Sequence, residues 1–380
     1  MPRDINRRID QLRTRRIGTD RLGRLNEEAQ YSVLAKSLTQ EAWQKRAAAK
    51  PYTRYGLGAM QEVDADYTRI SIETAERVSR QLYTGLTATG FSVDFRLQGS
   101  VPLNVHIRGV SDVDLLNLDT SFFTYATDGS RSLAGMYTNP TSQTSIGVLS
   151  DLRREAEKIL KSNYPTATVD TSGGKAISIS GGSLARPVDV VPSHWHDTIG
   201  YQRSGQEHDR GIAILNKKVP ETVNNLPFLH IKRIGDCDDS ALGGLRKAIR
   251  LCKNVKADAN EDGQGITLPS FDIAATMYHA DLSALRNGAV YELAILAETQ
   301  RHLDALARNL SHAGTLMVPD GSRRIFDTSE KMEGLVKLSV EMNDLAREVA
   351  KEQNHQLGIY FDLPLDIGRA VLSSVYIPAV

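Results

Sequence analysis

The sequence predicts an α/β protein in which a mixed sheet with flanking helices is followed by a helical lobe. Residues 61–215 alternate helical periodicity with short extended segments, and two apolar strands in this region are interrupted by carboxylates. Residues 216–380 show mainly helical periodicity, and an N-terminal helical arm at 1–60 precedes both regions. The boundaries follow from the change in element type, because no linker or internal repeat marks them. A chain of 380 residues is long enough for two lobes.

Composition excludes several classes of protein. With 41% apolar and 24% charged residues and no apolar run of about 18 residues, we expect a soluble enzyme without a membrane segment. The 46 basic and 46 acidic residues balance, so a nucleic-acid activator is not expected unless a local patch binds it. Only Cys237 and Cys252 are present, and the N-terminus lacks the apolar segment of a secretory signal. These features predict a cytoplasmic protein.

Arginine is concentrated at the N-terminus. The first 25 residues hold eight arginines among three aspartates, together with an intermittent apolar series, Ile5, Ile9, Leu12 and Ile17. This pattern predicts an amphipathic helix that packs on the body of the protein with its charged face in solvent. A regulatory or nucleic-acid contact is the alternative.

The catalytic region begins with a long helix and a strand. Apolar residues at helical spacing predict a helix over 64–89, which Gly90 ends. Alternating residues predict a strand over 92–97, which stops at Gly99 and Ser100. Glycine lets a phosphate approach the backbone closely, and serine adds a hydroxyl donor beside the amides of a short helix expected to follow.

Two carboxylates interrupt the next predicted strand, 112–116. Because residues two apart on a strand project to the same face, Asp112 and Asp114 should lie side by side. Their mutual repulsion needs a positive partner, and Mg²⁺ prefers such hard oxygen ligands. Asp-x-Asp alone is a weak signal, and in most proteins it would cap a turn or form surface ion pairs.

A third carboxylate follows in a predicted hairpin. A helix over 146–162 precedes the extended segments 175–180 and 186–192, which a Gly-Gly-Ser turn connects. Asp189 lies in the apolar second strand, RPVDVVP. Three acids and a Gly-Ser turn together permit a two-metal site for phosphoryl-group chemistry.

These segments resemble a known signature. LQGSVPLNVHIRGVSDVDLL, followed by RPVDVVP, is similar to the Gly-Ser, Asp-x-Asp and third-Asp motif of the DNA polymerase β-like nucleotidyltransferase superfamily. Within it the chain resembles the bacterial cGAS/DncV-like nucleotidyltransferases, over about residues 60–280. The resemblance implies a polymerase β-like core with a mixed sheet, a helical C-terminal lobe, and nucleotides bound between them.

The resemblance also implies residue roles. Gly99 and Ser100 would hold the β- and γ-phosphates, Asp112 and Asp114 would bind both metal ions, and Asp189 would bind the ion nearest the attacking hydroxyl. Those ions would be Mg²⁺, or Mn²⁺ in its place.

Further candidates lie in the helical half, where helices are expected over 240–256, 271–279, 282–310 and 329–353. Lys253 and Ser270 match a lysine and a serine that reach the triphosphate in the family, and Arg250 lies beside Lys253 on a basic stripe. The alternative interpretations are a solvated helix face for Lys253 and a plain helix N-cap for Ser270. Asn104 departs from the threonine that many relatives have after the Gly-Ser turn.

The implied activity is synthesis of a cyclic di- or trinucleotide second messenger that contains a purine. The substrates would be ATP, GTP or both, and the product would activate an effector protein in bacterial anti-phage defence. Phe271, Tyr278 and Tyr201 are candidate stacking platforms for a purine base. Two alternatives remain: a transferase that makes linear oligonucleotides or modifies another acceptor, and an inactive nucleotide-binding regulator.

Overall fold

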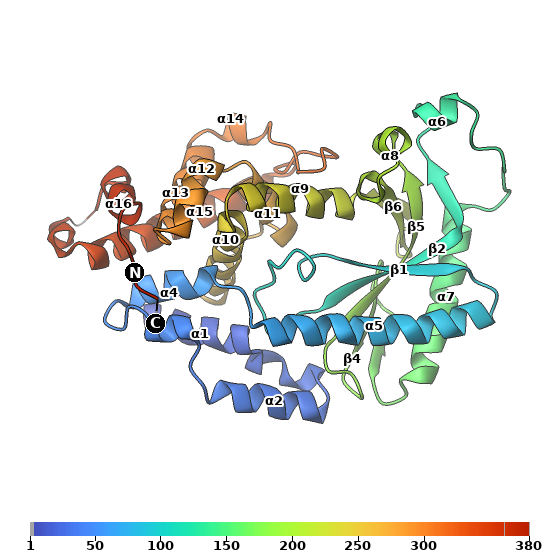
Figure 1. Cartoon of the computed structure of the whole chain (residues 1–380), viewed down its shortest axis with the longest axis horizontal. Coiled ribbons are helices and arrows are strands. Elements are labelled where there is room, and N and C mark those ends of the chain that lie inside the picture. Colours follow the sequence, from blue (N-terminus) through green and yellow to red (C-terminus); the bar gives the residue numbers. More distant parts are fainter. Residues whose placement is uncertain (1–3, 361, 380) are drawn as a thin grey trace.

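The computed structural model describes residues 4–360 and 362–379, which form a sheet-containing body beside a helical one (Figure 1). The helices of the N-terminal half are α1 Ile5–Ile17, α2 Glu27–Ser37, α3 Ala42–Lys45, α4 Pro51–Met60, α5 Ala65–Ala88, α6 Ser130–Leu133, α7 Ser145–Asn163 and α8 Ile199–Ser204. Those of the C-terminal half are α9 Pro227–Ser240, α10 Gly244–Glu261, α11 Ser270–Tyr278, α12 Leu282–Arg286, α13 Ala294–Arg308, α14 Leu310–Ala313, α15 Ser329–Gln353 and α16 Leu365–Leu372.

The sheet is mixed, as predicted. Its strands are β1 Val93–Gln98, β2 Val113–Tyr125, β3 Thr168–Asp170, β4 Ile177–Ser180, β5 Val188–Asp197, β6 Gly211–Asn216 and β7 Glu221–Asn225. They run in the order β1-β2-β5-β4-β3, and β6 pairs with the second half of β5 and with β7. Only β2 and β5 are parallel neighbours, and every other pair is antiparallel. The sheet continues to residue 225, ten residues beyond the expected boundary at 215.

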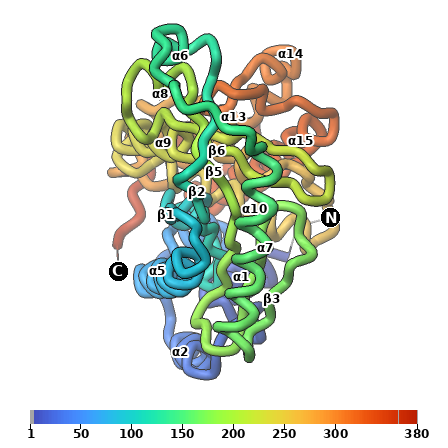
Figure 2. The backbone as a smooth tube through the Cα atoms, turned by 90° about the vertical axis from the view of Figure 1, so that its right-hand side faces the viewer, coloured from blue at the N-terminus to red at the C-terminus, as the bar shows by residue number. Residues whose placement is uncertain are grey.

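Helices α5 and α7 cover one face of the sheet (Figure 2). These two helices confirm the predictions over 64–89 and 146–162. Their apolar faces pack on alternate residues of the central strands. The shared core includes Val113 and Leu115 of β2 and Val188 and Val190 of β5. Because side chains alternate along a strand, the residues between these four project to the opposite, uncovered face.

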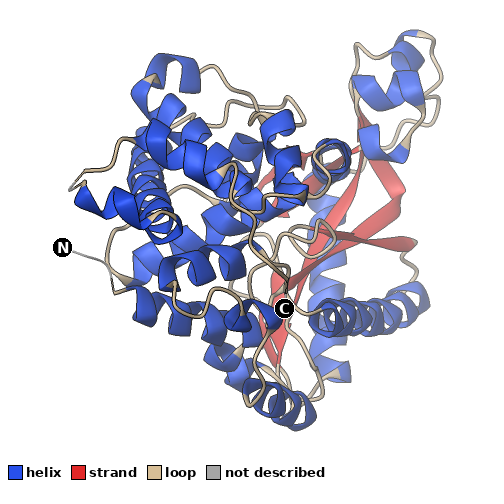
Figure 3. Cartoon of the chain, turned by 60° about the vertical axis from the view of Figure 1, so that its left-hand side comes forward, coloured by secondary structure: helices blue, strands red, loops and turns tan. Residues whose placement is uncertain are grey.

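The helical body includes the N-terminal arm. Leu12 of α1 and Tyr55 and Met60 of α4 are completely buried in the same core as α10, α13 and α15. Figure 3 shows this helical body lying beside the strands, with α5 next to the sheet. Segments at opposite ends of the sequence thus build one core. No helix in the described part of the chain is long and apolar enough to cross a membrane.

The arginines of α1 differ from the prediction of a solvated face. The helix packs on the body as expected, but Arg8, Arg15 and Arg16 are at most 4% exposed. Arg15 donates to Asp258 at 2.7 Å, and Arg8 lies 3.0 Å from the Glu341 carboxylate. The prediction holds for Arg7, whose side chain is 57% exposed. It was wrong for the other three because carboxylates distant in sequence pair with their guanidinium groups, which a helical pattern does not reveal.

Two predicted helices have different bounds. The helix expected over 282–310 is divided into α12 and α13 by a short turn at 287–293. Gly288 in this turn packs so closely against the Ile295 side chain that a Cβ would overlap it. The helix expected over 240–256 begins at Gly244, because Gly243 has a left-handed φ of 85° that separates it from α9.

Candidate active site

Two of the predicted metal ligands lie next to each other on the uncovered face of the sheet. The parallel register pairs Asp114 of β2 with Asp189 of β5, so their side chains project to the same side. Val113 and Val188, one residue earlier on each strand, point into the core under α5 and α7. Asp112 immediately precedes β2. The alternation seen in the sequence therefore places all three residues at one edge of the uncovered face.

Gly99 lies directly against this face. It follows β1, whose last residue, Gln98, pairs with Asp114. Its φ is +83°, a conformation that glycine adopts without strain. A Cβ on Gly99 would lie 3.2 Å from Cγ of Asp114 and would overlap its Oδ2. Only glycine lets the chain turn this close to the carboxylate. Turns rather than the expected short helix follow Ser100.

Burial and repulsion between neighbouring carboxylates disfavour the charged forms of Asp114 and Asp189. Burial, followed by the charges of Asp189 and Asp112, raises the pKa of Asp114 to about 7. Burial also raises the pKa of Asp189, whose Oδ1 atom is buried without a hydrogen-bond partner. Buried acceptors normally have a partner. This unpartnered oxygen and the repelling carboxylates fit a site for a divalent cation.

Asp112 is held by the N-terminal arm. Its carboxylate lies 2.7 Å from Nη1 of Arg24 and 3.5 Å from Nη1 of Arg21. Among residues 4–360 and 362–379, no three His, Cys, Asp or Glu side chains already surround a metal position. The two arginines therefore supply positive charge beside Asp112.

The basic stripe of α10 holds the loop after Ser100. Arg246, Arg250 and Lys253 donate to the carbonyl oxygens of the consecutive residues 103–105, at 3.0, 2.6 and 2.6 Å. Within that loop Asn104 has a φ of +55°, which asparagine tolerates better than most residues. The departure from threonine at this position therefore has a conformational explanation.

Lys253 is a buried cation. It is 8% exposed, and burial, followed by the charges of Arg250 and Lys256, lowers its pKa to about 8. Ser270 is the first residue of α11, so the free amides of that helix lie beside its hydroxyl. A buried lysine next to a helix N-terminus is a typical environment for an anion.

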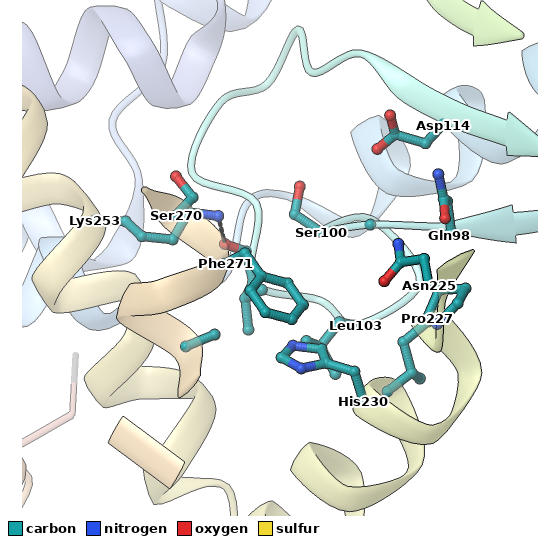
Figure 4. Close-up of a pocket in the computed structure, with 14 residues that line it drawn as sticks. Gln98, Ser100, Leu103, Asp114, Asn225, Pro227, His230, Lys253, Ser270 and Phe271 are labelled. Atoms are coloured by element: carbon teal, nitrogen blue, oxygen red, sulfur yellow. Dashed lines mark hydrogen bonds between the residues drawn. The ribbon is translucent and has the colours of Figure 1, made fainter. Parts of the chain in front are cut away.

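Two cavities meet at these residues. Figure 4 shows the first, about 360 Å³ in volume, with Asp114 and Ser100 on one side and Lys253 and Ser270 on the other. It is lined by Gln98, Gly99, Ser100, Leu103, Val105, Asp114, Asn225, Pro227, His230, Ile231, Lys253, Ser270, Phe271 and Ala274. The second, about 430 Å³, is lined by Arg21, Ser100, His106, Ile107, Arg108, Ser111, Asp112, Asp114, Asp189, Lys253, Lys256, Ala257 and Ser270.

The cavities contain the three aspartates, Gly99, Ser100, Lys253 and Ser270, but not Arg250. Arg250 is 5% exposed, and its donors point to the carbonyl oxygens of Met60 and Asn104. Arg21, Arg108 and Lys256 also line the second cavity, although they were not among the residues predicted from the sequence. A signal existed for Lys256, which lies three residues after Lys253 on the same stripe.

One of the three candidate stacking platforms lies in a cavity. Phe271 stacks on His230 with ring centroids 4.2 Å apart, and both line the first cavity (Figure 4). Tyr278 instead packs edge-on against His279. Tyr201, in α8, lies under the guanidinium groups of Arg131 and Arg210. The first cavity thus combines a flat aromatic surface with polar groups.

Sequence comparison finds close relatives. A cyclic dinucleotide synthase, CdnE, from Yersinia aleksiciae is 44% identical over 356 residues, which cover 91% of this chain and 92% of the relative. A c-di-GMP synthase from a Lachnospiraceae bacterium is 33% identical over 282 residues, 68% of this chain and 79% of the relative. No protein-family model matches the chain.

Solved structures share the fold. The CdnE c-di-GMP synthase of a Flavobacteriaceae species superposes with a TM-score of 0.72 at 23% identity, covering 93% of this chain and all of that one. The enzyme from Capnocytophaga granulosa gives 0.68 at 28% identity, covering 90% and 97%. The mixed sheet and helical lobe are thus those of the cGAS/DncV-like nucleotidyltransferases. On this evidence the chain belongs to the CdnE family of cyclic dinucleotide synthases and is a nucleotidyltransferase that makes cyclic oligonucleotides.

Proposed function

We propose that the chain joins two purine nucleoside triphosphates into a cyclic dinucleotide, with GTP as a substrate and c-di-GMP as the favoured product. The observation that carries this proposal is that Asp112, Asp114 and Asp189 line the second cavity together with Ser100 and Lys253. Relatives at 33% and 31% identity are c-di-GMP synthases, which supports guanine as the base.

We propose that the three aspartates hold Mg²⁺, or Mn²⁺ in its place. The unpartnered Oδ1 of Asp189 and the repulsion around Asp114 support this assignment. Such ions, when bound, lower the pKa of an attacking hydroxyl and neutralise a departing pyrophosphate.

The side chains of this protein orient the nucleotides. The turn at Gly99 brings the backbone and the Ser100 hydroxyl close to the phosphates, and the Lys253 ammonium and the free amides of α11 stabilise their charge. Phe271 offers a face on which a purine stacks, worth about 1–3 kcal/mol per base in single-strand binding.

The product is proposed to activate an effector protein in anti-phage defence, and the reaction to take place in the cytoplasm. Two solved relatives are described as STING-associated, which supports an effector that recognises the cyclic product. Nucleoside triphosphates are the proposed substrates whichever effector recognises the product.

The test is product identification. The protein is incubated with the four nucleoside triphosphates and Mg²⁺, the mixture is treated with phosphatase, and resistant products are identified by mass spectrometry. A phosphatase-resistant product that requires GTP supports the proposal. A linear product as the sole species, or robust synthesis from pyrimidine triphosphates alone, contradicts it.

A further inference from the structure

The second cavity continues beyond the predicted nucleotide-binding residues toward the N-terminal arm. Ser100, Asp114, Lys253 and Ser270 line both cavities, so one ligand in contact with them reaches into each. The first cavity has the aromatic surface and one lysine. The second has no aromatic ring except His106. It contains the three aspartates proposed to hold Mg²⁺ and, beside them, the basic side chains Arg21, Arg108, Lys253 and Lys256. A base therefore fits the first cavity, and a polyanion fits the second.

Lys256 is the basic residue of this cavity that lies nearest Lys253 in the sequence. It lies one helical turn after Lys253, half-buried, with Nζ donating to the Leu268 carbonyl oxygen at 2.6 Å. Burial lowers the pKa of its ammonium group. In the described part of the chain no ion pair to a carboxylate is found for Lys256 or for Lys253, whose Nζ donates to a carbonyl oxygen. Two neighbouring, partly desolvated ammonium groups repel each other, and an anion between them would offset that cost.

The other two basic residues that line this cavity, Arg21 and Arg108, come from the N-terminal half of the chain. Arg108 pairs with Asp20 of the N-terminal arm. Arg21 donates to the Val110 carbonyl oxygen at 3.4 Å and lies 3.5 Å from Asp112. Both Arg21 contacts are long for a charged hydrogen bond, so its guanidinium group loses little when it turns toward a phosphate.

We propose that Arg21, Arg108 and Lys256 form a terminal-phosphate wall, which binds the β- and γ-phosphates of the nucleotide whose base occupies the first cavity. This inference rests on the proposed function and extends it to residues outside the family signature. It also gives the N-terminal arm a place in substrate binding, because Arg21 follows the helix that Arg15 anchors to α10. The wall would distinguish triphosphates from nucleotides with shorter tails.

Binding measurements on the full-length protein test the wall. The ligands are α,β-methylene GTP, α,β-methylene GDP and GMP, titrated calorimetrically with Mg²⁺ so that no reaction takes place. The variants are Lys256→Met and Arg108→Met, with Lys256→Arg to restore the charge. Lys247→Met is the matched control, since Lys247 lies on the same helix, pairs with Glu292 and lines neither cavity.

The expected result is a selective loss. In Lys256→Met and Arg108→Met the affinity for the triphosphate analogue should fall about ten- to hundredfold, the usual range for a charge-assisted contact, while GMP binding stays within twofold. Lys256→Arg should recover most of the loss, and Lys247→Met should behave as the wild type. Thermal melting within a few degrees of the wild type would show that the variants are folded.

Two results would contradict the assignment of Arg21, Arg108 and Lys256 to a terminal-phosphate wall. Equal losses for the three ligands would mean that these residues shape the site generally, and unchanged affinities would mean that they do not meet the phosphates. The proposed function is tested separately by product formation in the wild type. If the wild type makes the cyclic product but Lys256→Met still prefers the triphosphate to GMP, the terminal-phosphate wall is contradicted and the proposed function stands.

Discussion

Replacing Gly99 by alanine separates backbone strain from a direct effect on the Asp114 carboxylate. Gly99 has a φ of +83°, and Gly90, between α5 and β1, has a φ of +90°. Both are exposed, but a Cβ on Gly90 meets no atom within 4 Å, whereas one on Gly99 overlaps Oδ2 of Asp114. Gly90→Ala is therefore a control with the same strain and no collision.

The stability cost should be alike in the two variants. An alanine in the left-handed region costs about 1–2 kcal/mol, which for a chain of this length lowers the melting temperature by only a few degrees. The collision at Gly99 adds little to this cost, because the Asp114 side chain can rotate away. Its carboxylate then leaves the position beside Asp189, and a displacement of about 1 Å of a catalytic group costs on the order of a hundredfold in rate.

Melting curves and pyrophosphate release from GTP with Mg²⁺ measure the two effects. We expect both variants to melt within a few degrees of each other, with Gly90→Ala near wild-type activity and Gly99→Ala about a hundredfold slower. Activity of Gly99→Ala within threefold of Gly90→Ala would refute the reasoning, since it would show that Asp114 does not need the space that glycine leaves.

Three further predictions concern the same site. Asp112→Asn combined with Asp114→Asn should abolish product without unfolding the protein, since it removes repelling carboxylates; pyrophosphate release by the folded double variant would exclude the metal site. Ser100→Ala and Lys253→Ala should weaken triphosphate binding about ten- to hundredfold more than monophosphate binding, and equal losses would remove both residues from the phosphate site. Because burial raises the pKa of Asp114 from 3.8 to about 7, the folded state holds this proton more tightly than the unfolded state. The stabilisation is complete below pH 4 and is lost as the pH rises through 7. Relative to Asp114→Asn, the wild type in EDTA should lose melting temperature between those values; parallel profiles would contradict the shift.

Much of the sheet and the three aspartates could be predicted from the sequence. Alternation along a strand reports which side chains share a face, and apolar spacing along a helix reports which face is buried. These local rules placed α5, α7, β1 and the two strands that carry Asp114 and Asp189. They were less reliable at helix ends such as Gly243, where a single left-handed residue decides the boundary.

The partners of the charged residues were decided only by the tertiary structure. A helical pattern shows that Arg15 or Arg250 lies on a polar face, but its partner depends on how distant segments pack. Arg15 donates to Asn254, 239 residues away, and Arg250 donates to a carbonyl oxygen 146 residues away. Arg21 likewise reaches Asp112 across 91 residues. The sequence by itself therefore determined which carboxylates share a face of the sheet, because periodicity is local. The fold decided which basic side chains surround them, because electrostatic partners are set by proximity in space.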